Sequence, residues 1–149
     1  MKKIIILLFV LFVFSTVTQA AEGVITKTSK HSVKQTMDTL EKIVRDKGFN
    51  VAARVNHAAA ATKVGETLRP TEVLIFGNPK LGTLLMQSDQ TIGIDLPLKV
   101  LVYEDEKGSV TLAYNDPTWL AKRHNIADRD KAFAKMSGAL NNFTNAAVK

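Results

Sequence analysis

The sequence of 149 residues contains no cysteine. This absence excludes disulfide bonds, thiol catalysis, cysteine-ligated metal clusters and a lipid anchor on cysteine. Without a disulfide framework the fold must be stabilised by a hydrophobic core. A chain of this length can bury such a core within one domain.

Several functional signatures are also missing. There is no Gly-x-Gly-x-x-Gly loop and no Gly-x-Ser-x-Gly turn, so neither a nucleotide cradle nor a serine nucleophile elbow is indicated. The 20 basic and 14 acidic residues are interspersed, without a dense basic run. We therefore predict no nucleic-acid partner, because tracking a phosphate backbone requires clustered Lys and Arg.

Histidine is scarce, and no two His residues are four apart. His31, His57 and His124 are the only three. A metal site would have to gather ligands from distant segments, with Asp95 or Asp116 as helpers. We predict no metal and no cofactor.

Only the N-terminus contains a long apolar run. Three residues that include two Lys precede the apolar run Ile4–Phe14, and small or polar residues follow it up to Ala20. This order is typical of a cleaved secretory signal. The run is shorter than the roughly 18 residues of a membrane span, although an uncleaved anchor remains the alternative. We predict a signal peptide over 1–20, one domain over 21–149, a periplasmic or secreted location, and membrane contact only before cleavage.

The remainder carries alternating helical and strand patterns. Ser32 and Gln35 form a capping box ahead of an amphipathic helix, and Gly48 follows its end. Apolar alternation predicts strands at 24–28, 49–56, 98–103 and 110–114. Further helices are predicted at 33–47, 58–64, from Pro79 to 88, from Pro117, and from about 128, with a loop at 89–95.

The strand prediction at 73–76 has apolar residues at every position, which favours a central strand covered on both sides. A turn ending at Gly108 joins two later strands and requires that they pair antiparallel. We predict an α+β fold with the order β-α-β-(α)-β-(α)-β-β-(α)-α. A mixed, mostly antiparallel sheet of about five strands packs against two long helices on one face.

Several short motifs, spread over nearly all of the chain after residue 20, resemble the domain of unknown function 302 family. They are, in order, Asn56-His57-Ala58-Ala59-Ala60, the stretch from Gly65 to Glu72, Phe76-Gly77-Asn78-Pro79, Leu84-Leu85-Met86-Gln87, Asp95-Leu96-Pro97-Leu98-Lys99 and Tyr114-Asn115-Asp116-Pro117. The resemblance implies a compact α+β domain that forms a homodimer, and it implies no activity. The family's motif positions correspond to His57, Gly77, Asn78, Pro79, Pro97 and Asp116.

His57 is the leading candidate for chemistry, because imidazole can act as base, acid or metal ligand near neutral pH. It follows a strand directly and begins a helix, a place where we expect it in the interior of the domain. The alternative is that it only fixes the turn by a hydrogen bond. Both interpretations remain open from the sequence.

Asn78 and Asp116 each precede a proline at the start of a helix, which is typical of helix caps. The functional alternative is that these helix starts converge with His57 around a pocket. Exposed first-turn amides would then bind a small polar or anionic ligand. Lys99 and Arg69 are candidates to supply positive charge.

Three functions follow as hypotheses. We favour an exported small binding or interaction module of the cell envelope, with no molecular activity specified. The alternative is a small hydrolase or lyase in which His57 is the general base and Asn78 helps to stabilise developing negative charge. The third hypothesis, metal or haem binding by His57, lacks a second ligand at suitable spacing.

Overall fold

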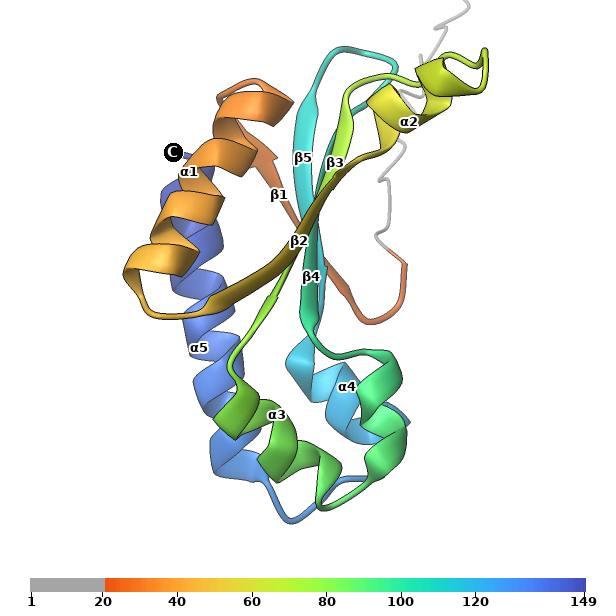
Figure 1. Ribbon diagram of the computed structural model, residues 1–149. Coiled ribbons are helices and arrows are strands. Elements are labelled where there is room, and N and C mark those ends of the chain that lie inside the picture. Colours follow the sequence, from red (N-terminus) through yellow and green to blue (C-terminus); the bar gives the residue numbers. More distant parts are fainter. Residues whose placement is uncertain (1–20) are drawn as a thin grey trace, which may run out of the picture.

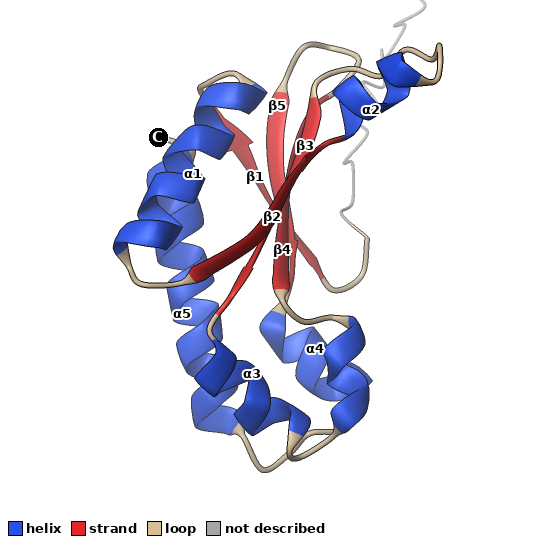
Figure 2. Cartoon of the chain, in the orientation of Figure 1, coloured by secondary structure: helices blue, strands red, loops and turns tan. Residues whose placement is uncertain are grey.

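The computed structural model describes residues 21–149, so the predicted signal peptide lies outside the described residues. Eleven elements follow one another in this part of the chain (Figures 1 and 2). They are β1 (Val24–Ser29), α1 (Val33–Asp46), β2 (Asn50–Asn56), α2 (His57–Lys63), β3 (Thr71–Gly77), α3 (Pro79–Met86), the 3-10 helix η1 (Gln90–Ile94), β4 (Leu98–Glu104), β5 (Val110–Asn115), α4 (Pro117–Arg123) and α5 (Asp130–Ala147).

The five strands form one sheet in the order β1-β5-β4-β3-β2. Every pairing in it is antiparallel, including the predicted β4–β5 hairpin, whose turn residue Gly108 has a φ of 76°. A positive φ of this size favours glycine because it has no Cβ. The predicted α+β class is confirmed, and the sheet is antiparallel throughout rather than mixed.

The long helices α1 and α5 lie side by side on one face of the sheet (Figure 1). The capping box of α1 is present, with the Ser32 side chain accepting from the Gln35 amide. Alternate strand residues point at these helices and are buried. The core includes Leu74, Phe76, Val100, Val102 and Leu112 from the strands, Met37 and Leu40 from α1, and Met136 and Leu140 from α5.

The prediction that β3 is covered on both sides is wrong. Burial alternates along the strand, and the residues between Glu72, Leu74 and Phe76 are only half-buried. Because directly paired residues of antiparallel strands share a face, the register groups four aliphatic side chains on the side away from α1 and α5. This open face includes the aliphatic residues Val55, Val73, Ile75 and Leu101, and also Lys99, the partner of Ile75.

The short helices α3 and α4 and the 3-10 helix η1 form a lobe at the end of the sheet where β3 ends and β4 begins (Figure 2). The predicted loop at 89–95 is wrong, because η1 occupies it. Asp89 caps η1 by accepting a hydrogen bond from the Thr91 amide at 2.8 Å, and Ile92 is fully buried. One buried residue gives too little periodicity to predict so short a helix.

Arg54 of β2 connects the sheet to α1 by a group of ion pairs. Its Nε donates to Glu72 Oε2 at 2.7 Å and its Nη1 donates to Asp38 Oδ1 at 2.6 Å. Hydrogen bonds from Lys34 and then Arg54 lower the pKa of Asp38. The buried Glu72 carboxylate depends on Arg54 and on Asn56, whose side-chain amide donates to it at 3.3 Å.

Replacing Arg54 by methionine is expected to lower the free energy of unfolding by about 2–3 kcal/mol near pH 7, because Glu72 loses its charged partner. The lowered pKa of Asp38 stabilises the fold above its unfolded pKa of about 3.9, and this contribution disappears as the pH falls through the folded value. The difference in unfolding free energy between the wild type and Arg54→Met should therefore be smaller at pH 3 than at pH 7. Urea unfolding of both proteins at the two pH values measures this difference.

Arg45→Met is the matched control, because Arg45 pairs with Glu41 at the surface, where an ion pair contributes at most about 1 kcal/mol. Equal losses in the Arg54 and Arg45 variants would contradict the structural role of Arg54.

Leu74→Ala tests the core directly. Leu74 is fully buried in β3, so truncation should cost about 2–5 kcal/mol of unfolding free energy. The control is Leu68→Ala, since Leu68 is 47% exposed and its loss should change stability by about 0.5 kcal/mol or less. A cost below about 1 kcal/mol for Leu74→Ala, measured by chemical denaturation, would show that the site is not packed as described.

Candidate functional site

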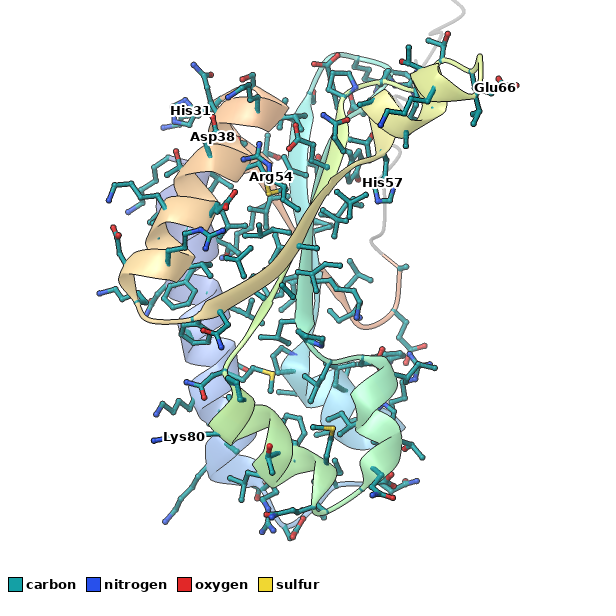
Figure 3. All side chains as sticks on the ribbon, viewed as in Figure 1. His31, Asp38, Arg54, His57, Glu66 and Lys80 are labelled. Carbon is teal, nitrogen blue, oxygen red and sulfur yellow. The ribbon has the colours of Figure 1, made fainter. Side chains whose placement is uncertain are left out.

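His57 lies on the surface, which corrects the expectation that it is interior. It is the first residue of α2, and Asn56, not His57, caps this helix by accepting from the Ala59 amide at 2.8 Å. Its side chain is exposed and has no hydrogen-bond partner among residues 21–149. Figure 3 shows His57 at the α2 end of the molecule and Lys80 at the opposite end.

The alternative in which His57 converges with Asn78 and Asp116 around a pocket is not what the structure shows. β3 separates them: His57 follows the residue paired with Glu72 at one end of the strand, and Asn78 follows Gly77 at the other. Seven residues of strand span roughly 20 Å at about 3.3 Å per residue. Asp116 follows β5, which ends on the Asn78 side of the sheet.

Asn78 and Asp116 act as the helix caps that the sequence predicts. Asn78 Oδ1 accepts from the amides of Lys80 and Leu81 at 3.0 and 3.4 Å. Asp116 accepts from the Thr118 amide and from its hydroxyl, each at 2.8 Å. These first-turn amides already donate to the capping side chains. They are therefore not available as donors for the anion site that the functional alternative requires.

Lys99 does not face a ligand site either. Its ammonium donates to the carbonyl oxygens of Asp95 and Pro97 at 3.3 and 3.2 Å. This geometry places the charge over the chain segment that leads into β4. The other proposed cation, Arg69, donates to the Glu104 carbonyl on the far end of the sheet at 3.3 Å.

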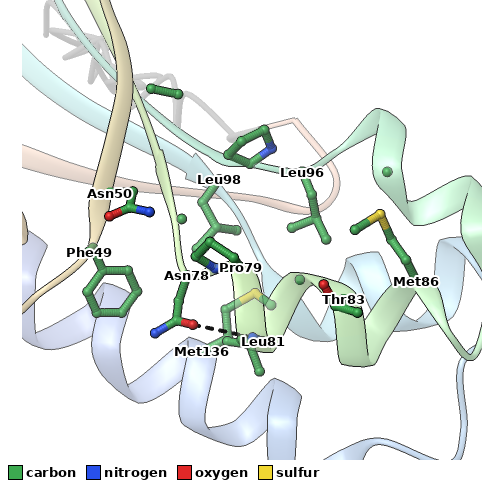
Figure 4. A pocket seen from close by; sticks show the side chains of 15 residues that line it. Phe49, Asn50, Asn78, Pro79, Leu81, Thr83, Met86, Leu96, Leu98 and Met136 are labelled. Carbon is green, nitrogen blue, oxygen red and sulfur yellow. Dashed lines mark hydrogen bonds between the residues drawn. The ribbon is translucent and has the colours of Figure 1, made fainter.

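The structure does bring four of the motif positions together. Gly77, Asn78, Pro79 and Pro97 line a hollow of about 290 Å³ between the end of the sheet and the lobe (Figure 4). We call it the junction hollow. Its remaining walls are mainly apolar and include Phe49, Leu81, Met86, Leu96, Leu98 and Met136.

Glycines keep the junction hollow open. A Cβ at Gly77 would lie 3.3 Å from Pro97 Cβ, and one at Gly93 would lie 3.4 Å from Met86 Sδ. Gly82 lies inside α3, where a Cβ would approach Leu96 and Met86 at 3.9 and 4.0 Å. Larger side chains at these positions would therefore occupy the space of the hollow.

A second hollow of about 360 Å³ lies beside the first, with walls from α3 and α5, and we call it the helix hollow. The two share five wall residues, namely Phe49, Asn78, Leu81, Leu98 and Met136. Lys80 and Lys135 line the helix hollow, and both side chains are exposed. Lys80 extends away from α3 in Figure 3.

The buried histidine is His124, and no pattern in the sequence distinguishes it as a candidate. His124 Nε2 lies 2.6 Å from Asp95 Oδ2, and Nδ1 lies 2.9 Å from the Thr91 hydroxyl. That hydroxyl donates to Asp89 at 2.7 Å. Both ring nitrogens are engaged and the residue is only 6% exposed, so this network joins α4 to η1 rather than facing a substrate.

Metal binding gains no support within the described residues, where no three His, Asp or Glu side chains are grouped closely enough to hold an ion. Across residues 21–149 no helix combines the length and apolarity needed to cross a membrane.

Two sequence signals could have indicated the walls of the hollows. One is glycine inside a helical pattern at Gly82, and the other is methionine, which fills irregular space, at Met86 and Met136.

Comparison with known proteins finds related sequences within longer chains. The chain is 48% identical over 104 residues to two proteins named as fluoride-specific ion channel FluC 1, one from Brucella suis and one from Brucella abortus. The matched segment covers 70% of this chain, but 41% and 38% of those two proteins. The chain thus spans about two-fifths of the length of these curated relatives.

Comparison of structures finds the same fold in a crystal structure of an uncharacterized conserved DUF302 protein from Bacillus stearothermophilus. The TM-score is 0.76 with 20% sequence identity, over 87% of this chain and 100% of the other. At that identity the likeness shows the fold alone. The sequence signature described as "Domain of unknown function DUF302" matches residues 25–143, and the chain therefore belongs to the DUF302 family.

Proposed function

We propose that this chain is a non-catalytic binding module of the cell envelope and that the junction hollow is its ligand site. One observation carries the proposal: Gly77, Asn78, Pro79 and Pro97, which the family resemblance singles out, line the same hollow although the two prolines are 18 positions apart in the sequence. Concave, mostly apolar hollows with a few polar groups are where small ligands bind.

The walls favour a ligand with an apolar body. Phe49, Leu96 and Met136 offer hydrocarbon contact, while Asn50 and Asn78 supply the polar lining on the sheet side. The sequence led us to expect a small polar or anionic ligand. These walls instead favour a ligand that has a substantial apolar part. His57 lies at the other end of β3, so a hydrolase or lyase based on it gains nothing from this hollow.

The envelope setting rests on the signal-like residues 1–20 and on the relatives. The two Brucella proteins that contain a similar segment are named as ion channels, and ion channels work in membranes. A binding module exported to the membrane surface or the periplasm agrees with both observations.

We assign the predicted homodimer to the open face. Val55, Val73, Ile75 and Leu101 offer an aliphatic surface to a second copy, and the charged Lys99, which pairs with Ile75, lies on the same face. Burying half-exposed aliphatic side chains contributes roughly 25 cal/mol per Å². The opposite face of the sheet is already covered by α1 and α5, which leaves the open face to self-associate.

Gly82→Leu tests the junction hollow. The neutral dye N-phenylnaphthylamine, which fluoresces in apolar surroundings, should bind the wild type, and the Gly82→Leu variant should bind at least about tenfold more weakly, a change of about 1.4 kcal/mol. The leucine fills the hollow. It should not harm the helix, because leucine is the better helix former by up to about 1 kcal/mol.

Gly138→Leu is the matched control, because Gly138 of α5 is exposed and a Cβ added there would meet nothing within 4 Å. His57→Ala is a second control. Both should bind the dye like the wild type. Loss of dye binding in His57→Ala, or full binding in Gly82→Leu, would refute the junction hollow as the ligand site.

Native mass spectrometry of the protein recovered from the envelope fraction of its host tests export and self-association together. We expect a subunit lacking residues 1–20 and a dimeric mass. Leu101→Lys should give the monomer, since its ammonium would be buried without a partner on the same face as Lys99. Thr67→Lys, at an exposed connecting segment, should remain dimeric. A full-length cytoplasmic monomer would contradict both parts of the proposal.

A further inference from the structure

The two hollows form adjoining parts of one apolar surface. They lie on either side of a shared wall that includes Leu81 and Phe49, two side chains that are only half-buried. The helix hollow adds further hydrocarbon from Phe76, Leu84 and Phe143, and Leu84 is 39% exposed. A ligand that occupies both hollows would contact this surface along its length.

The charged residues at this surface are all of one sign. Among the described residues that line either hollow, only Lys80 and Lys135 are charged, and neither hollow is lined by Asp or Glu. Neither lysine is within ion-pair distance of a carboxylate in residues 21–149. Both ammonium groups are therefore free to meet an anion at the edge of the helix hollow.

We propose that the ligand class is a single-chain anionic amphiphile, whose hydrocarbon chain lies in the junction and helix hollows and whose head group meets Lys80 and Lys135. This inference rests on the proposed function and specifies the ligand. The apolar walls suit the chain, while the two lysines, one from α3 and one from α5, both line the helix hollow and supply complementary charge.

The expected strength of the charge contribution is modest. We expect each lysine to contribute about 0.3–0.7 kcal/mol, as is usual for ion pairs of exposed side chains, and this contribution weakens with added salt. Two lysines should therefore give about a three- to tenfold preference for an anionic over a cationic head group on the same chain. Most of the affinity should come from burial of the chain.

Displacement of N-phenylnaphthylamine provides the test. Below their micelle concentrations, dodecanoate should displace the dye at about three- to tenfold lower concentration than dodecyltrimethylammonium, and added salt should reduce this preference. In the double variant Lys80→Gln with Lys135→Gln, the preference should fall to about one, while the dye itself binds unchanged.

The matched control is Lys107→Gln with Lys122→Gln, which removes the same charge from exposed positions outside both hollows and should keep the preference. Equal displacement by the two amphiphiles in the wild type would overturn the anionic ligand class and leave the junction hollow intact as a site. A preference that survives in the Lys80 and Lys135 variant would overturn the role of these lysines. Failure of the dye and of both amphiphiles to bind would overturn the proposed function itself.

Discussion

The fold depends on the burial of one face of the sheet beneath α1 and α5. No disulfide shares this task, because the chain has no cysteine. The central strands alternate between this buried face and an open face that α1 and α5 leave uncovered, and Leu74 and Phe76 are fully buried while Val73 and Ile75 are not. Apolar burial at roughly 25 cal/mol per Å² is the main favourable contribution to such a core. The ion pairs of Arg54 then hold β2 against α1 at its edge.

The same packing creates the candidate site. α5 extends beyond the sheet, α4 packs against it, and η1 packs against α3 in the same lobe (Figure 1). Where this lobe meets the ends of β3 and β4, short residues occupy the contact points, notably Gly77, Gly82 and Gly93. The side chains are thus closely packed along the sheet, but they leave the junction hollow where the sheet meets the lobe. A ligand could enter there without disturbing the core, and the buried His124 network holds η1 and α4 in place behind it.

Sequence reasoning located the motif residues but grouped them wrongly. Asn78 and Asp116 were identifiable as caps because capping is a local interaction between a side chain and amides two or three residues later. His57 was grouped with them because each follows a strand. Neighbouring antiparallel strands, however, end at opposite ends of the sheet. The end at which a residue lies depends on how the strands pair, and the local sequence pattern does not contain that information. The exposure of β3 on one face was missed for the same reason, since an unbroken apolar run fits a strand with either one or two covered faces.

The sequence by itself determined the α+β class, the order of the elements other than η1, the caps of α1, α3 and α4, and the family resemblance, because these depend on periodicity and on contacts within a few residues. Only the tertiary structure decided that His57 is exposed while His124 is buried, that Pro97 joins Asn78 around the junction hollow, and that Lys80 and Lys135 line the adjoining helix hollow. Lys80 and Lys135 are 55 positions apart. Their proximity to one surface arises from the antiparallel register and from the packing of α5 across the end of the sheet, which no local pattern specifies.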